Sequence, residues 1–62
     1  MCEAKVYLIE GEDTQMVMEA VDTIEPIDDG LRLISIFGDQ KVFKAQIHSL
    51  SLVDHKVFLK PA

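Results

Sequence analysis

The chain has 62 residues and a net charge of −5, from 11 Asp and Glu against 6 Lys and Arg, and 48% of its residues are hydrophobic. This length predicts a single domain, residues 1–62. A domain this small buries only about 60% of its unfolded surface and is marginally stable alone. The acidic balance disfavours a phosphate-binding surface, and no apolar run reaches the roughly 18 residues that span a membrane. So much apolar surface in so small a body predicts burial against a second copy, most simply in a homodimer.

Short runs of alternating apolar residues, separated by turn residues, predict an all-β chain of five to six short strands. The expected strands are 2–9, 14–20, 31–37, 41–45, 46–53 and 57–60. Residues 21–28 form a less regular extended segment, a bulged or an edge strand, because Pro26 interrupts its helix-like spacing. Asp28-Asp29-Gly30 predicts a hairpin turn in which the glycine can take a positive φ. Strands this short predict a small, strongly bent antiparallel barrel of the SH3-like kind.

The only cysteine, Cys2, directly follows Met1. Removal of Met1, which is usual before a small residue, gives Cys2 a free α-amine beside its thiol. These two groups and the amide nitrogen of Glu3 can form fused chelate rings around one metal ion, and nitrogen with thiolate in a square plane is typical of Ni(II) or Cu(II). If Met1 is retained, the site needs the thiolate and other donors, including donors from a second chain. The alternative is that Cys2 packs as a small hydrophobe in the first strand.

The two imidazoles and two of the methionines are further candidate ligands. His48 and His55 could bind nickel or zinc, although a solvated or turn-bonding role suits His55 in its turn. Met16 and Met18, expected on one face of their strand, could offer thioethers to Cu(I). The simpler interpretation of this methionine pair is adaptable core packing.

Two acidic turns are further candidates for cation binding, and the sequence contains no recognisable catalytic motif. The turns contain Glu10, Glu12 and Asp13, and Glu25, Asp28 and Asp29. Either turn could hold a hard cation, but neither has the spacing of a calcium loop, so solvated carboxylates are the simpler interpretation. A dyad of Cys2 with His48 or His55 is conceivable. With no nucleophile elbow, no phosphate loop and little room for a substrate pocket, the chain is predicted not to be an enzyme.

Four segments spread over nearly the whole chain carry a family resemblance. They are Met-Cys-Glu-Ala-Lys-Val-Tyr, Val-Met-Glu-Ala-Val-Asp-Thr-Ile-Glu-Pro, Ile-Phe-Gly-Asp-Gln-Lys and Leu-Val-Asp-His-Lys-Val-Phe-Leu. Together they look like the CooT family of small nickel-binding proteins, which are associated with maturation of carbon monoxide dehydrogenase. The resemblance implies a homodimer of small β-barrels that binds Ni(II) with Cys2 as the essential ligand. The same family has also carried a predicted RNA-binding label.

The leading hypothesis is a non-enzymatic nickel carrier. We expect a homodimer that holds one Ni(II) through Cys2, with the backbone amide of Glu3 as a further donor, and supplies it to a client such as carbon monoxide dehydrogenase. A single thiol and a start without a signal peptide predict a cytoplasmic protein. The alternative is an SH3-like interaction module that binds RNA or a protein partner, and the scattered cations make nucleic acid an improbable ligand.

Overall fold

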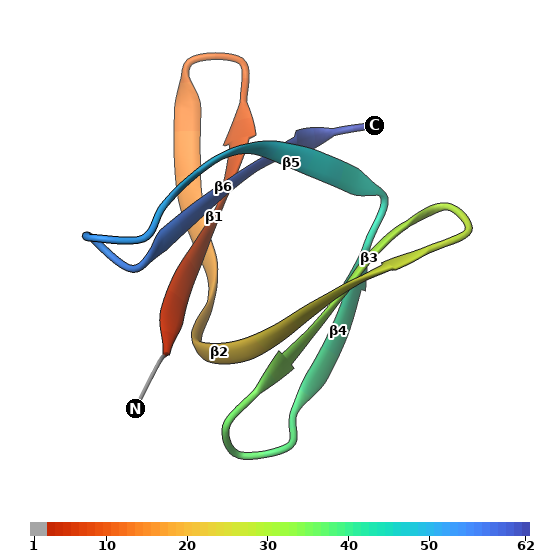
Figure 1. The fold of residues 1–62 in the computed structure, drawn as a ribbon. Coiled ribbons are helices and arrows are strands. Elements are labelled where there is room, and N and C mark those ends of the chain that lie inside the picture. The colour runs from red at the N-terminus through yellow and green to blue at the C-terminus, as the bar shows by residue number, and fades with distance from the viewer. Residues whose placement is uncertain (1–2) are drawn as a thin grey trace.

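The computed structural model describes residues 3–62, which form six strands and no helix. The strands are β1 (Ala4–Glu10), β2 (Asp13–Ile27), β3 (Gly30–Ser35), β4 (Gln40–Phe43), β5 (Ala45–Ser51) and β6 (Lys56–Pro61). They make one sheet in the order β4-β3-β2-β1-β6-β5, which curls into a half-barrel (Figure 1). The predicted all-β class is confirmed. Within the described part of the chain no helix is long and apolar enough to cross a membrane.

One strand pair departs from the expected antiparallel arrangement. β1 and β6 run parallel, with Val6 beside Val57 and Leu8 beside Leu59, whereas the other four pairs are antiparallel. Parallel neighbours need a long crossover connection, which here consists of β2 to β5. The expectation of an antiparallel barrel throughout is therefore wrong for this pair, because turn residues report only on strands that follow one another directly.

The long strand β2 replaces two expected segments, 14–20 and 21–28. The chain bends at Ala20, whose φ is 58°, and the pairing with β3 shifts register between Val21 and Thr23. The backbone amide of Ile36 donates a hydrogen bond to the Ala20 carbonyl at 2.8 Å, which fixes the bend against the end of β3. The bulged, extended interpretation of residues 21–28 is confirmed, but this segment continues the preceding strand.

The two edge strands, β4 and β5, are separated along the chain only by Lys44. The chain therefore passes from one edge of the sheet to the other in a single bend, which Figure 1 shows between β4 and β5. The Ala62 amide donates to the Lys44 carbonyl at 3.2 Å, so the end of the chain is tied to this bend. The bend keeps the sheet curled around its inner face.

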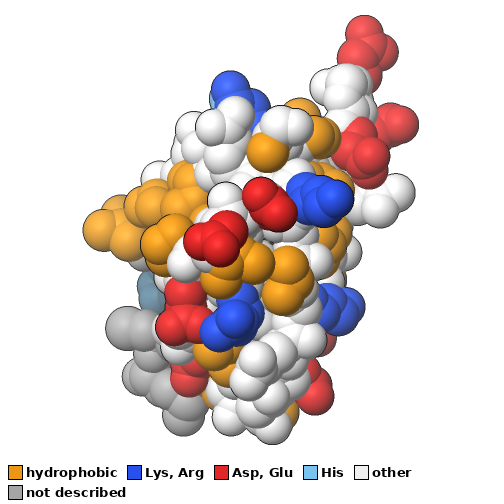
Figure 2. Space-filling view, turned by 90° about the vertical axis from the view of Figure 1, so that its right-hand side faces the viewer, with side chains coloured by type: hydrophobic (Ala, Val, Ile, Leu, Met, Phe, Trp, Pro, Cys, Tyr) orange, Lys and Arg blue, Asp and Glu red, His pale blue; other side chains and the backbone are white. Residues whose placement is uncertain are grey.

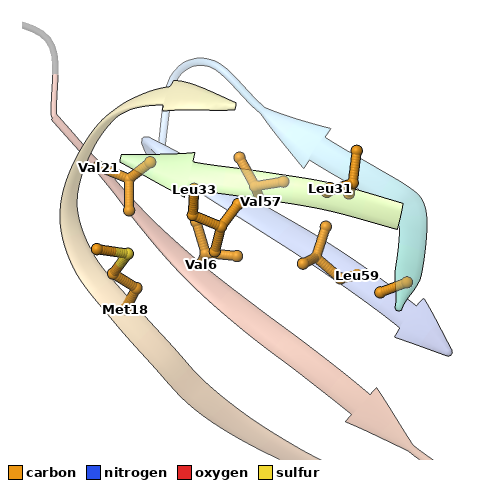
Figure 3. Packing of buried hydrophobic residues seen from close by; sticks show 8 residues of the cluster. Val6, Met18, Val21, Leu31, Leu33, Val57 and Leu59 are labelled. Carbon is orange, nitrogen blue, oxygen red and sulfur yellow. The ribbon is translucent and has the colours of Figure 1, made fainter. Parts of the chain in front are cut away.

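The hydrophobic core fills the inside of the curl. Val6, Leu33 and Leu59 are fully buried, and Figure 3 shows side chains of β1, β2, β3 and β6 pointing toward one another. The whole buried cluster consists of Val6, Met18, Val21, Leu31, Leu33, Ala45, Val57 and Leu59. Ala4 and Leu8 pack against it, so alternate residues of β1 share the inward face with Val6.

A bulge in β2 overturns the predicted placement of the two methionines. Met16 pairs with Tyr7 and Met18 pairs with Val6, so Val17 is an extra residue between the two pairs. An extra residue reverses the alternation of a strand. Met18 consequently lies in the core at 9% exposure, while Met16 is 49% exposed on the outside. The expectation that the two methionines share one face is wrong.

A second bulge, at His48 in β5, has the same effect. Ile47 pairs with Leu59 and Leu50 pairs with Val57, with a register shift between Ile47 and Ser49. Both partners in β6 are buried, so Ile47 and Leu50 lie on the inner side of the sheet. Strict alternation would place Ile47 and Leu50 on opposite faces of the strand, but the extra residue brings them to the same side.

Candidate functional site

Cys2, the central residue of the predicted metal site, lies outside the described residues. Glu3, whose backbone amide was the second predicted donor, is the first described residue and its side chain is exposed. The structure describes the residues that follow Cys2 along the chain and the surfaces beside those residues.

The start of β1 is held on two sides. Ala4 pairs with Val21 of β2, and the Lys5 amide donates to the His55 carbonyl at 2.9 Å. His55 has a φ of 58°, a left-handed conformation that histidine adopts more readily than most residues. Its backbone therefore anchors β1 from the β5–β6 turn, while its side chain is exposed. These contacts fix the position of the start of β1.

Two hollows flank this point. The larger, of about 450 Å³, is lined by Glu3, Ala4, Val21, Asp22, Ile24, Leu52 and His55. The smaller, of about 280 Å³, is lined by Glu3, Ala4, Lys5, Glu19, Ala20 and Phe37. Glu3 and Ala4 belong to both, so the start of β1 forms the wall between them.

The charges around the two hollows are mainly negative. Glu3 and Asp22 line the larger hollow, and Glu19 adds a carboxylate to the smaller one. Lys5 is the only Lys or Arg among the lining residues of either hollow. Carboxylates that border a concave surface raise the local concentration of cations. The surroundings of the predicted site therefore suit a metal cation better than an anionic ligand.

Exposed apolar side chains project beside the same hollows. Phe37 is 78% exposed at the smaller hollow and Leu52 is 81% exposed at the larger one, next to Val53 at 90%. Figure 2 shows hydrophobic side chains gathered at one edge of the molecule, away from the acidic side chains at its projecting upper corner. Exposed apolar side chains therefore lie on both sides of the start of β1.

Ser35 sets the position of Phe37. Its buried hydroxyl accepts hydrogen bonds from the amides of Phe37 and Asp39, at 3.1 Å and 3.2 Å, and its own amide donates to the Asp39 carbonyl. These bonds close the β3–β4 turn around one polar side chain. The turn thereby presents Phe37 toward solvent at the rim of the smaller hollow.

The other predicted candidates are dispersed over the fold. His48 occupies the bulge of edge strand β5, whereas His55 lines the larger hollow. The first acidic turn is exposed at the tip of the β1–β2 hairpin, and in the second Glu25 pairs with Arg32 at 3.1 Å. Within residues 3–62 no group of three or more His, Cys, Asp or Glu side chains could hold a metal ion.

Sequence reasoning missed most of the residues that line the hollows. Glu19, Asp22, Phe37 and Leu52 come from three separate segments that only the folded sheet brings to the start of β1. The one related signal in the sequence was the excess of apolar residues, which predicted a surface buried against a second copy but not its position.

Comparison with known proteins identifies relatives along the full length of the chain. A family model described as the CO dehydrogenase accessory protein CooT matches residues 1–60. A crystal structure of a candidate CooT from Carboxydothermus hydrogenoformans is 41% identical, with a TM-score of 0.92 and 98% of both chains covered. An uncharacterized protein of Methanothermobacter thermautotrophicus is 35% identical over 60 residues, 97% of this chain and 89% of that protein. Another, from Methanocaldococcus jannaschii, is 32% identical over 97% of this chain and 98% of its own length.

The family match and the structural match agree with the half-barrel described above and with the resemblance carried by the four sequence segments. The chain belongs to the family of the CO dehydrogenase accessory protein CooT.

Proposed function

We propose that the protein binds Ni(II) as cargo through the thiolate of Cys2 and the backbone amide nitrogen of Glu3, and that it supplies the ion to a nickel enzyme such as carbon monoxide dehydrogenase. The observation that carries this proposal is the family match, which describes a CO dehydrogenase accessory protein and includes position 2. An accessory role of this kind is binding and transfer, without catalysis, and it takes place in the reducing cytoplasm where a lone thiol stays free.

The chemistry of the donors supports nickel. A thiolate with nitrogen donors gives the strong ligand field that favours square-planar Ni(II). Cys2 is the only cysteine of the chain, so a second thiolate has to come from a second copy. Where Met1 is removed, the α-amine of Cys2 adds another nitrogen, and where it is retained the Cys2 amide takes that place.

The surroundings of Glu3 support a cargo site that a client can reach. Glu3 is exposed and borders both hollows, and Glu19 and Asp22 add negative charge nearby. The negative potential attracts the incoming cation. An ion held at such an exposed position can be transferred by ligand exchange without unfolding of the core.

A homodimer is the second element of the proposal. Phe37 and Leu52 expose large apolar surfaces beside the start of β1, where a second copy would bring its own Cys2 close. Burying these side chains in a twofold interface would remove apolar surface from water. We therefore expect one Ni(II) per two chains, with one Cys2 thiolate from each copy.

A titration with Ni(II), on protein whose N-terminus has been determined by mass spectrometry, tests the proposal. Native protein should develop thiolate-to-nickel charge-transfer absorption that saturates at one ion per two chains, with a diamagnetic centre. Cys2→Ser should abolish the absorption and the tight binding while the circular dichroism spectrum stays unchanged. His48→Ala and His55→Asn serve as matched controls, since Asn tolerates the left-handed backbone at position 55.

Other outcomes would contradict parts of the proposal separately. Unchanged nickel affinity in the Cys2→Ser variant would place the ion elsewhere. One nickel per chain without any change in association would replace the shared site by an independent amine, amide and thiolate chelate in each copy. Paramagnetic nickel without sulfur charge transfer would assign the ion to carboxylates or imidazoles.

A further inference from the structure

Charge is strongly segregated along the chain. Residues 1–39 hold 10 of the 11 carboxylates and two of the 6 Lys and Arg, so they carry −8, whereas residues 40–62 hold four cations and one carboxylate and carry +3. The second group forms β4, β5 and β6, which are the two edges of the sheet and the strand beside β5. A molecule with a net charge of −5 therefore has one basic sector.

The outer side of β1, β6 and β5 gathers part of this positive charge on one surface. Val6, Val57 and Leu59 point into the core, so their neighbours in the strands point outward. The register aligns the outward residues across the three strands. We call this surface the basic face; it consists of Lys5, Tyr7, Lys56, Phe58 and Lys60, with Gln46, Ser49 and Ser51 beside them. It contains three cations, and the carboxylates of Glu3 and Glu19, which share the smaller hollow with Lys5, border it at one end.

Two lysines lie directly side by side at one end of the basic face, next to the Tyr7–Phe58 row. Lys5 and Lys56 are register partners in the parallel pair β1–β6, and neither forms an ion pair with any residue of 3–62. Like charges opposite each other on neighbouring strands destabilise a sheet. The next strand pair offers no carboxylate in compensation, because Ser51 is the β5 partner of Lys56. A local arrangement of like charges that costs stability is typical of a binding surface.

The aromatic side chains next to these lysines provide a firm apolar base. Tyr7 and Phe58 stack with ring centroids 5.2 Å apart and planes at 20°, and the Lys56 ammonium lies over the Tyr7 ring at 6.0 Å from its centroid. Both rings are partly exposed. The basic face thus combines cations with half-buried aromatic surface, which suits an anionic partner that also makes apolar contacts.

We propose that the basic face, centred on Lys5, Lys56 and the Tyr7–Phe58 stack, binds an extended acidic segment of a partner protein. Charge complementarity selects the partner, because unpaired lysines attract carboxylates and repel cationic segments. The inference goes beyond the nickel site and does not depend on it, since none of these side chains belongs to the proposed donors.

The same features disfavour nucleic acid as the occupant. Bases are read on single strands by stacking on free aromatic faces, whereas the facing sides of Tyr7 and Phe58 cover each other and Lys56 lies over the tyrosine. Three lysines release few counterions from a polyphosphate.

The proposal is tested by NMR on metal-free, isotope-labelled protein with an octaglutamate peptide as the probe. The peptide should shift the amide signals of β1, β5 and β6, and the effect should weaken at physiological salt as charges are screened. Lys56→Glu should weaken binding by at least about fivefold, because it reverses the charge beside the Tyr7–Phe58 stack. Lys41→Glu on β4 makes the same charge change off the face and should stay within about twofold of native protein.

The two variants also separate this inference from the nickel proposal. Lys56→Glu should keep its nickel stoichiometry while losing the peptide, whereas Cys2→Ser should keep the peptide while losing nickel.

Several results would overturn the inference. These are the absence of peptide-induced shifts at low salt, shifts that map outside β1, β5 and β6, or equal losses in the two lysine variants. Tighter binding of oligouridine than of octaglutamate would reassign the face to RNA. Shifts of the same signals that depend on protein concentration without peptide would reassign it to a second copy of the chain.

Discussion

Lys5 and Lys56 are register partners on parallel strands, with like charges on the same outer side of the sheet and no carboxylate partner within residues 3–62. Changing Lys56 to Glu converts this pair into one of opposite charge. We expect the variant to be more stable than native protein by about 0.5 kcal/mol, which is typical of a cross-strand pair. Urea denaturation at low salt measures the change, with Lys41→Glu as the control for net charge. A destabilised Lys56→Glu variant would show that the lysine ammonium matters more for its contact with Tyr7.

Gly30 is required by the close approach of β4 to the start of β3. Its φ is not positive, contrary to the turn expectation, but a Cβ at this position would clash with the Phe43 carbonyl and lie 3.0 Å from the Lys44 Cα. Because backbone atoms cannot move aside singly, Gly30→Ala should cost about 2–4 kcal/mol. Gly11→Ala meets no atom within 4 Å and should cost about 1 kcal/mol, through its positive φ alone. Equal losses in thermal unfolding of the two variants would contradict this interpretation.

The hydroxyl of Ser35 holds the β3–β4 turn that presents Phe37. Ser35→Ala leaves the amides of Phe37 and Asp39 without their acceptor, and we expect a loss of about 1–3 kcal/mol in the free energy of unfolding. Ser49→Ala, at an exposed position of β5, should change stability by less than about 0.5 kcal/mol. Chemical denaturation of both variants checks the difference, and NMR should locate the disturbance at residues 35–39.

The proposed dimer depends on the apolar side chains beside the larger hollow. Leu52→Glu places a charge at an 81% exposed position, so it should leave the monomer fold intact while weakening association. Val42→Glu, 59% exposed on β4, is the matched control away from this hollow. Sedimentation of the metal-free proteins measures the change. Equal dimerisation of the Leu52→Glu and native proteins would move the interface elsewhere.

Nickel affinity should rise with pH. A thiol binds nickel only as the thiolate, and its ordinary pKa is near ~8.5, so below that pH each bound thiolate releases a proton. A site shared by two Cys2 thiolates therefore loses affinity more steeply on acidification than a site with one thiolate. Calorimetry at several pH values in buffers of different ionisation enthalpy counts these protons. A pH-independent affinity would exclude thiolate ligation.

Local sequence patterns predicted the strands but not all of their partners. Alternation along β1 holds in the structure, since Ala4, Val6 and Leu8 share one face and this face lies against the core. Met16 and Met18 were expected on one face, which was wrong because the bulge between them adds one residue and reverses the alternation after it. The bulge at His48 does the same to Ile47 and Leu50. A bulge is defined by the pairing of two strands, so its position cannot be predicted from the alternation of residues within one strand.

The sequence predicted the candidate site only at the position where one residue type alone indicates metal binding. Cys2 stands out because it is the sole thiol. The hollows around Glu3 were not predictable, because Asp22 and Phe37 reach them through the bend at Ala20 and through the turn held by Ser35. The basic face was also missed, since scattered lysines converge only when β1 and β6 pair.

The parallel pairing of β1 and β6 imposes an order on biosynthesis. The strand that adjoins Cys2 is made first, but its second neighbour is made last, so β1 stays open along one edge until β6 emerges from the ribosome. Contacts between such distant parts of a chain slow folding and delay protection of the unpaired edge. A chain that terminates before β6 also lacks Val57 and Leu59 of the core and the turn residue His55 that anchors Lys5. We therefore expect the surroundings of the proposed cargo site to take their final form only after β6 has been translated.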